Sequence, residues 1–168
     1  MKNILFTLSL FVSFCCSGQG TDKEKALEIH NIERASLKLK SLEWSSKLER
    51  DAQKYADYLA KKEKFRHSNS NELNNLNQGE NLFKLEGDFN LKDYLSEASF
   101  SWLSEKKDYV YAKIGNNKNI LSKVGHYTQM IWHNTTKIGI AYSISKSGDV
   151  YVVARYYPSG NWDGEYPY

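Results

Sequence analysis

Two stretches in the C-terminal half of the chain decide the fold. The first reads Gly125-His126-Tyr127-Thr128-Gln129-Met130-Ile131-Trp132, and the second reads Tyr151-Val152-Val153-Ala154-Arg155-Tyr156-Tyr157-Pro158-Ser159-Gly160-Asn161-Trp162. The first begins as a turn and continues as a short helix, and the second begins as a Val- and Tyr-rich strand. Residues 137–145 form a similar strand, and the Lys146-Ser147-Gly148-Asp149 segment between them predicts a hairpin turn. This hairpin must join further strands, for which residues 81–84 are a candidate.

The segments before the hairpin carry helical patterns. Apolar residues recur at helical spacing over residues 21–39, 46–60 and 91–107, and these ranges predict three helices. Polar residues suited to capping their N-termini are Thr21 with Glu24, Ser46 with Glu49, and Asn90. Loops are expected at residues 68–77 and 115–119. Helices followed by an antiparallel hairpin, with no repeat and no linker between them, predict one α+β domain.

Composition excludes some classes of function. The chain has 168 residues, of which 40% are hydrophobic and 26% charged, which suits one domain with a real core. Its formal net charge is only +3 and is dispersed along the chain, so nucleic acid is not an expected partner. The aromatic share of 14%, with 12 Tyr and 4 Trp, favours an aromatic-walled groove.

The N-terminus has the pattern of a signal peptide. Lys2 provides the positive start, and the apolar run from Ile4 to Phe14 is too short to span a bilayer as a helix. Small residues that offer cleavage sites follow at Ser17, Gly18 and Gly20. We therefore expect residues 1–20 to be removed, residues 21–168 to form the mature domain without a transmembrane segment, and the protein to be secreted, either extracellular or periplasmic. The alternative is a buried N-terminal helix.

The two cysteines sharpen this expectation. Cys15 and Cys16 both lie at the end of the apolar run, so the mature domain would contain no cysteine and no disulfide. A second interpretation is that Cys15 or Cys16 is the lipid-modified first residue of a lipoprotein. Phe14 before Cys15 is bulkier than such cleavage usually prefers.

The two stretches quoted at the outset resemble the signature motifs of the CAP superfamily (cysteine-rich secretory proteins, antigen 5 and pathogenesis-related 1 proteins). The resemblance extends from His30-Asn31 to Trp162, which is nearly the whole mature chain. It implies a three-layer α-β-α sandwich with a central antiparallel sheet. Many animal relatives are rich in disulfides, so the absence of cysteine after residue 16 indicates a cysteine-poor, bacterial-type member.

The resemblance also implies a site. Arg66-His67-Ser68 is similar to the loop that bears the first family histidine, and Gly125–Gln129 contains the second, His126. Gly79-Glu80-Asn81-Leu82 and Trp102-Leu103-Ser104-Glu105 are similar to the segments that bear the two family glutamates. His67, Glu80, Glu105 and His126 are therefore expected to meet in one cleft, with Gln129 and Tyr109 on its wall.

One observation supports this set independently of the resemblance. Glu105 continues the apolar stripe formed by Leu95, Ala98 and Trp102 on the predicted third helix. A carboxylate on a buried face needs a partner, and an imidazole is an apt one. Two histidines and two carboxylates also suit a borderline divalent ion such as zinc. Imidazole nitrogen is the better ligand, so His67 and His126 are the candidate metal ligands.

The role of the set remains open at this stage. Glu80 and Glu105 would orient the imidazoles or bind a metal-bound water, and in the second case they are candidate catalytic residues of a hydrolase. Two His–Glu pairs can equally pin a loop to a helix with neither metal nor turnover. Ser68 is the one nucleophile that we would name, on the strength of its position beside His67.

Three hypotheses follow. The first is a secreted binding module whose ligand is a divalent metal, a small apolar molecule such as a lipid or sterol, or both. The apolar ligand is expected because the resemblance includes relatives that bind sterols, fatty acids or phospholipid surfaces. The second is a zinc-dependent, peptidase-like hydrolase that uses the His/Glu set. The third is a protein–protein interaction module. We favour the first, with no metal needed for folding.

Overall fold

The computed structural model describes residues 20–69, 78–87, 93–115 and 120–168. Its longer helices are α1 (Asp22–Ser36), α2 (Ser46–Lys62), α3 (Tyr94–Ser104) and α4 (Leu121–Met130), and a 3₁₀ turn, η1 (Glu105–Asp108), follows α3 directly. Four strands complete the described elements: β1 (Glu43–Trp44), β2 (Gly79–Leu85), β3 (Lys137–Ile144) and β4 (Val150–Tyr157). None of the described helices is long and apolar enough to cross a membrane.

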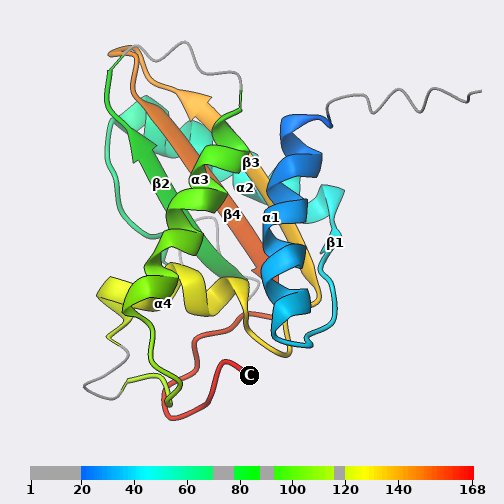
Figure 1. Ribbon diagram of the computed structural model, residues 1–168. Coiled ribbons are helices and arrows are strands. Elements are labelled where there is room, and N and C mark those ends of the chain that lie inside the picture. Colours follow the sequence, from blue (N-terminus) through cyan, green and yellow to red (C-terminus); the bar gives the residue numbers. More distant parts are fainter. Residues whose placement is uncertain (1–19, 70–77, 88–92, 116–119) are drawn as a thin grey trace, which may run out of the picture.

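These elements form the three layers expected of an α-β-α sandwich. The strands lie in the order β1-β3-β4-β2, with α1 and α3 on one face of the sheet and α2 on the other (Figure 1). β4 pairs antiparallel with both β2 and β3, as predicted. The sheet as a whole is mixed, because the two-residue strand β1 pairs parallel with the start of β3.

The central strand β4 explains the two-sided core. Alternate side chains of a strand point to opposite faces. Val152, Ala154 and Tyr156 pack with the α1/α3 layer, whereas Tyr151 and Val153 pack against α2. β4 is buried at every position except its last residue, which is the pattern of a strand covered on both faces.

A glycine sets the distance between α2 and the sheet. A Cβ atom at Gly139 of β3 would lie 2.1 Å from the backbone nitrogen of Glu49 and 2.6 Å from the carbonyl carbon of Leu48. No side chain fits in that space, so the N-terminal turn of α2 lies directly on β3.

Some helix boundaries differ from the predicted ones. α1 has the predicted capping box of Thr21 and Glu24. The N-cap of α2 is Ser45 rather than Ser46, since Ser45 accepts from the Leu48 backbone N–H. Glu49, the predicted partner of Ser46, accepts instead from the indole of Trp44 and the ammonium of Lys23.

The third helix differs most from its predicted range. It begins at Tyr94 rather than Leu91, with Asp93 at the N-cap position, and the predicted cap Asn90 lies outside the described residues. At its C-terminal end it tightens into η1 at Glu105 instead of continuing to Lys107. The predicted loop at 68–77 lies outside the described part of the chain except for its first two residues, and that at 115–119 except for Gly115.

A buried arginine fastens the loop after α4 to α1. Arg34 is fully buried, and its guanidinium donates to the backbone carbonyls of Lys40, Met130, Trp132 and Thr135. Burial lowers the pKa of Arg34 to about 10, which leaves it a cation at neutral pH. The carbonyls at the C-terminal end of α4 suit a cation, so Arg34 positions the helix that bears His126.

Candidate functional site

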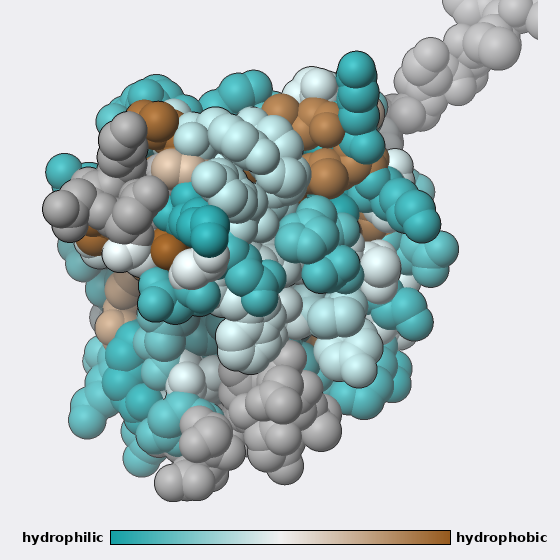
Figure 2. Space-filling model, turned by 90° about the horizontal axis from the view of Figure 1, so that it is seen from below, coloured by the Kyte–Doolittle hydropathy of each residue, from teal (hydrophilic) through white to brown (hydrophobic). Residues whose placement is uncertain are grey.

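A cleft opens at the end of the sheet where β2 begins and α4 passes. Its volume is about 270 Å³, and it is lined by His67, Glu80, Asn81, Leu121, Ser122, Gly125, His126 and Asn161. The end of the molecule below α4 is mainly hydrophilic, with apolar surface confined to separate small patches (Figure 2). Imidazole, carboxylate and amide groups border the cleft, together with the apolar side chain of Leu121.

His67 forms one half of the site. It follows α2 on an irregular segment, and its side chain is 62% exposed. Its Nδ1 lies 2.7 Å from Oε1 of Glu80, the second residue of β2. Glu80 is only 5% exposed, so a buried carboxylate holds an exposed imidazole at the mouth of the cleft.

Four donors surround the Glu80 carboxylate. Its Oε1 accepts from the His67 ring and from the Ser68 backbone N–H, and its Oε2 accepts from the Ser68 hydroxyl and lies 3.0 Å from Nη2 of Arg155. Burial alone would raise the pKa of Glu80, but the hydrogen bond from His67, the charge of Arg155 and the two bonds from Ser68 together lower it. Glu80 is therefore ionised at neutral pH.

His126 forms the other half. Its Nδ1 lies 2.6 Å from Oε1 of Glu105, and Oε2 of the same carboxylate accepts from the backbone N–H groups of His126 and Tyr127. The imidazole of His126 stacks at 6.2 Å on the indole of Trp102, which is buried in the core. The expectation that the partly buried Glu105 would pair with an imidazole therefore agrees with the geometry.

The residues that follow Glu105 and His126 are held by a single carboxylate of α1. Glu33 is buried, and it accepts from the hydroxyl of Tyr127 at 2.7 Å and from the ammonium of Lys106 at 2.9 Å. Burial, followed by this bond, raises the pKa of Tyr127, so its hydroxyl stays protonated and donates. Through Glu33, α1 therefore holds the residues that directly follow Glu105 and His126.

The two halves face one another across the cleft. The ring centroids of His67 and His126 are 6.5 Å apart, with their planes inclined by 30°. An ionised carboxylate can only accept a hydrogen bond, so Nδ1 of His67 carries the proton that Glu80 receives. Within the described part of the chain, Nε2 of neither imidazole has a hydrogen-bond partner.

These residues fit a metal ion only in part. No group of three or more His, Cys, Asp or Glu side chains among the described residues is arranged to hold a metal. The protein can therefore offer two imidazole nitrogens, and other ligands would have to come from water or from a bound molecule.

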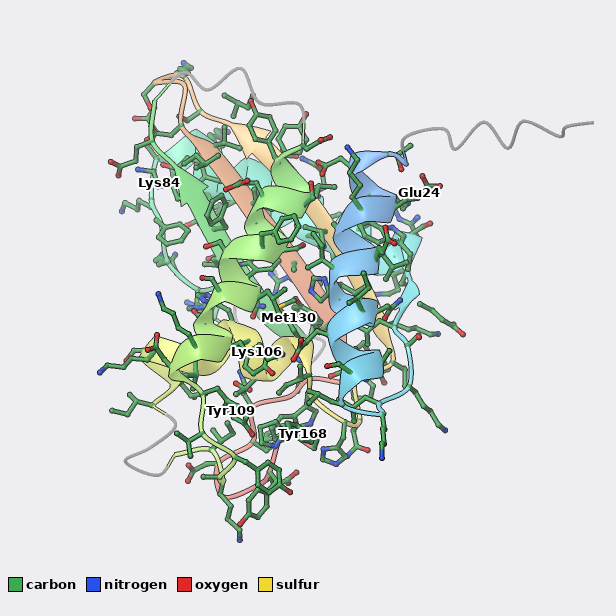
Figure 3. The ribbon with its side chains drawn as sticks, in the orientation of Figure 1. Glu24, Lys84, Lys106, Tyr109, Met130 and Tyr168 are labelled. Atoms are coloured by element: carbon green, nitrogen blue, oxygen red, sulfur yellow. The ribbon has the colours of Figure 1, made fainter. Side chains whose placement is uncertain are left out.

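Gln129 and Tyr109, expected on the wall of the cleft, lie elsewhere. Gln129 is buried behind the lining, where its amide accepts from the Gly160 N–H and donates to the Thr135 hydroxyl. Tyr109 packs against Tyr127 and Tyr168 beyond Lys106 (Figure 3). Nearness in sequence to Glu105 and His126 does not determine the direction of a side chain.

Ser68 also has a different setting from that of a nucleophile. Its hydroxyl donates to Glu80 at 2.8 Å and accepts from Nη1 of Arg155 at 3.1 Å. A hydroxyl engaged in this way orders a carboxylate, and no described histidine is bonded to it as a base.

Sequence reasoning missed two residues whose hydrogen bonds hold the site together, Asn81 and Arg155. Asn81 follows Glu80 and points to the opposite face of β2, where its amide donates to the backbone carbonyl of His126 and to the hydroxyl of Tyr156. Arg155 interrupts the apolar run of β4. That interruption was a usable signal, because a charge in a strand buried on both faces requires a partner.

A three-layer fold with two His–Glu pairs meeting at the end of its sheet defines the class of domain. A family model described as "CAP: Cysteine-rich secretory protein family" matches residues 27–156. The chain belongs to this family.

Relatives and solved structures agree with this assignment. Pathogenesis-related leaf protein 4 of Solanum lycopersicum is 34% identical over 165 residues, which cover 98% of this chain and 92% of the relative. Golgi-associated plant pathogenesis-related protein 1 of Homo sapiens is 34% identical over 137 residues, covering 82% of each chain. These relatives give no support to the expectation of a bacterial-type member.

Two solved structures are close in fold. The crystal structure of NaASP2 with Zn²⁺ superposes with a TM-score of 0.75 at 28% identity, over 91% of this chain and 88% of that one. The structure of BmVAL-1 superposes with a TM-score of 0.72 at 27% identity, over 92% and 85% of the two chains. The CAP fold expected from the sequence motifs is thereby confirmed.

Proposed function

We propose that this CAP-domain protein is secreted and that its His67/His126 cleft binds a divalent metal ion, with zinc the best match, without catalysing a reaction. The observation that carries the proposal is the pairing of each Nδ1 with a glutamate, at 2.7 Å for His67 and 2.6 Å for His126. Such pairing fixes the ring orientation and leaves the lone pair of Nε2 for a metal, which is the usual second contact of a metal-binding histidine.

The charge of the site supports a cation. The Glu80 carboxylate is balanced by Arg155, whereas the Glu105 carboxylate accepts from an imidazole and two backbone N–H groups and has no lysine or arginine partner among the described residues. The two rings would be the protein ligands, and water would complete the coordination. The related crystal structure of NaASP2 with Zn²⁺ supports the choice of this ion.

A zinc-dependent hydrolase is the alternative. It needs a carboxylate free to take a proton from a metal-bound water. Glu80 is unsuited to that role, because its oxygens already face four donors and its pKa is lowered. Glu105 has three donors and is the better candidate. A peptidase activity that required zinc and was lost in Glu105→Gln would favour this alternative.

The proposal is tested by calorimetric titration of zinc into the purified protein at pH ~7.5 and pH ~5.5. We expect saturable binding at the higher pH, and weaker binding at the lower pH, where free imidazoles are protonated. His67→Ala and His126→Ala should each weaken it strongly, and His133→Ala, which changes a histidine away from the cleft, should not. Equal binding by all four proteins would refute the proposal.

A lipid or sterol ligand is a second candidate, supported by a separate groove. A hollow of about 660 Å³ runs between α1 and α3, with Ile29, Ile32, Phe100 and Leu103 among its lining residues. Ile32 is 64% exposed and Phe100 is 57% exposed, so the groove offers apolar side chains to solvent. Charged residues on its rim, such as the Lys25–Asp93 ion pair, suit a ligand with a polar head.

Delipidated protein should then bind a labelled fatty acid or sterol, and Ile32→Asp should abolish the binding. His126→Ala, which alters only the cleft, is the matched control and should bind normally. Absence of binding, together with no lipid carried through purification, would exclude this candidate.

Secretion rests on the N-terminal pattern of residues 1–20, which lie outside the described residues except for Gly20. Family membership supports it, since the family description names secretory proteins. N-terminal sequencing of the exported protein should locate cleavage near Gly20. The alternative of a lipid anchor at Cys15 or Cys16 has no support from the relatives.

A further inference from the structure

Arg155 is the least expected residue of the sheet. It lies in the central strand β4, directly opposite Glu80 of β2, and it is fully buried. Burial lowers the pKa of Arg155, which nevertheless remains cationic because its ordinary value is far above neutral. A buried cation costs free energy, and an apolar side chain would fill a strand covered on both faces more cheaply. The contacts of Arg155 should therefore indicate what it does.

Those contacts converge on the segment that bears His67. One guanidinium nitrogen lies 3.0 Å from Oε2 of Glu80, and the other donates to the hydroxyl of Ser68 at 3.1 Å. The same guanidinium lies over the ring of Tyr55 at 5.2 Å, and the Tyr55 hydroxyl donates to the carbonyl of Arg66. Arg155 thus reaches the residues on both sides of His67 and the carboxylate that binds it.

His126 is held by different means. Its carboxylate partner Glu105 is satisfied by the His126 ring and by backbone N–H groups of α4, and no arginine contacts it among the described residues. The two halves of the cleft therefore differ. His126 is fixed by helix and core, whereas the exposed His67 depends on the polar contacts around Glu80.

We propose that Arg155 is the positioning residue of His67, acting through Glu80 and Ser68. By fixing the position of the Glu80 carboxylate and of Ser68, Arg155 holds Glu80 against Nδ1–H of His67 as its acceptor. The Nε2 lone pair of His67 then faces the cleft in one orientation. The consequence for metal affinity rests on the proposed function, whereas the consequence for the His67 ring does not.

The first test needs no metal. Long-range ¹H–¹⁵N NMR spectra of the metal-free protein at pH ~8 report which ring nitrogen of each neutral histidine carries the proton. We expect His67 to carry it on Nδ1 in the unaltered protein, and to shift largely to Nε2–H in Arg155→Met. Arg155→Lys, which keeps a cation beside Glu80, should restore most of the Nδ1–H form. His126 should not change, and an unchanged His67 spectrum in Arg155→Met would overturn the proposal.

A milder variant covers the case in which Arg155→Met does not fold. Ser68→Ala breaks the link between Arg155 and the His67 segment without removing a buried charge. It should shift His67 in the same direction by a smaller amount. No shift of His67 in Ser68→Ala would then overturn the proposal.

The second test is a double-mutant cycle on zinc affinity. Arg155→Met should weaken zinc binding by about 10–100-fold, the usual effect of losing an outer partner of a ligand. In a His67→Ala background the same change should have little further effect on residual binding, since a residue that acts only through His67 has nothing left to position. An equal loss in both backgrounds would mean a general structural role. If the unaltered protein bound no zinc, the proposed function would fail, while the NMR result would still decide the role of Arg155.

Discussion

His30 should make the fold sensitive to acid. It is fully buried on α1, where its Nδ1 lies 2.8 Å from the carbonyl of Ala26 and its Nε2 lies 2.8 Å from the hydroxyl of Tyr156. The carbonyl can only accept, so Nδ1 carries the proton and Nε2 accepts from Tyr156. Burial lowers the pKa of His30 from 6.5 to about 4, and the charge of Arg34 adds to this against the opposing bond to Ala26.

The sign of the effect follows from this lowered pKa. Above pH 6.5 the histidine is neutral in both folded and unfolded chains, and it contributes no pH dependence. Between pH 6.5 and pH 4 the unfolded chain takes up a proton and the folded chain does not. The free energy of unfolding therefore decreases as the pH is lowered through this range. The loss should reach about 2 kcal/mol at pH 5 and about 3 kcal/mol below pH 4.

Protonation of His30 should also disturb the hydrogen bonds behind the cleft. The hydroxyl of Tyr156 accepts from the amide of Asn81, which in turn donates to the carbonyl of His126. A proton on Nε2 of His30 would compete for the Tyr156 oxygen and disturb this chain of bonds. The Asn81–His126 contact is therefore coupled to the neutral state of His30.

The assay is urea unfolding of the unaltered protein and of His30→Gln at pH 7, 6 and 5. Glu80 and other carboxylates also contribute below pH 5, but equally in both proteins, so the difference between the two isolates His30. The unaltered protein should lose about 2 kcal/mol more than the variant between pH 7 and pH 5. Equal losses would refute the assignment of a buried, neutral His30.

Three further predictions concern packing, charge and metal. In urea titrations, Gly139→Ala should lower the free energy of unfolding by at least about 2 kcal/mol, because the new methyl group would collide with the α2 backbone. Gly125→Ala is the control and should change this free energy little, because its Cβ would make only ordinary van der Waals contacts. Glu105→Gln should weaken zinc binding about 10–100-fold in calorimetry, whereas Glu43→Gln on β1 should not. Protein stripped of metal with a chelator should still show a cooperative thermal unfolding transition, and zinc at 100 times its Kd should stabilise it by about 3 kcal/mol. Loss of that transition after chelation would contradict the expectation that folding needs no metal.

Local pattern predicted those elements whose sequence is strongly periodic. The ends of α2 and of the β3–β4 hairpin were predicted closely. In α2 the apolar residues recur at helical spacing, and in the two strands Ile, Val and Tyr follow one another closely, so both patterns are easy to recognise. The start of α3 was missed because Asn90 is as good a cap as Asp93, and local sequence does not choose between them. β1 could not be foreseen, since its two residues form a strand only through pairing with β3.

The candidate site also has a part that could be predicted from the sequence and a part that could not. Family resemblance implied that His67, Glu80, Glu105 and His126 would meet, and the structure brings them together at one cleft. The contacts that order them join residues far apart in the chain, such as Arg155 with Ser68 and Glu33 with Lys106. Only the apolar sequence around Arg155 hinted at such a partner, and nothing local identified which one.

The most direct test of the central claim is anomalous diffraction at the zinc absorption edge from crystals of the protein soaked in zinc. We expect one dominant peak within bonding distance, about 2 Å, of Nε2 of both His67 and His126. Both Nδ1–glutamate pairs should be intact. A cleft without a peak at saturating zinc, or zinc bound only at His133 or at surface carboxylates, would contradict the claim.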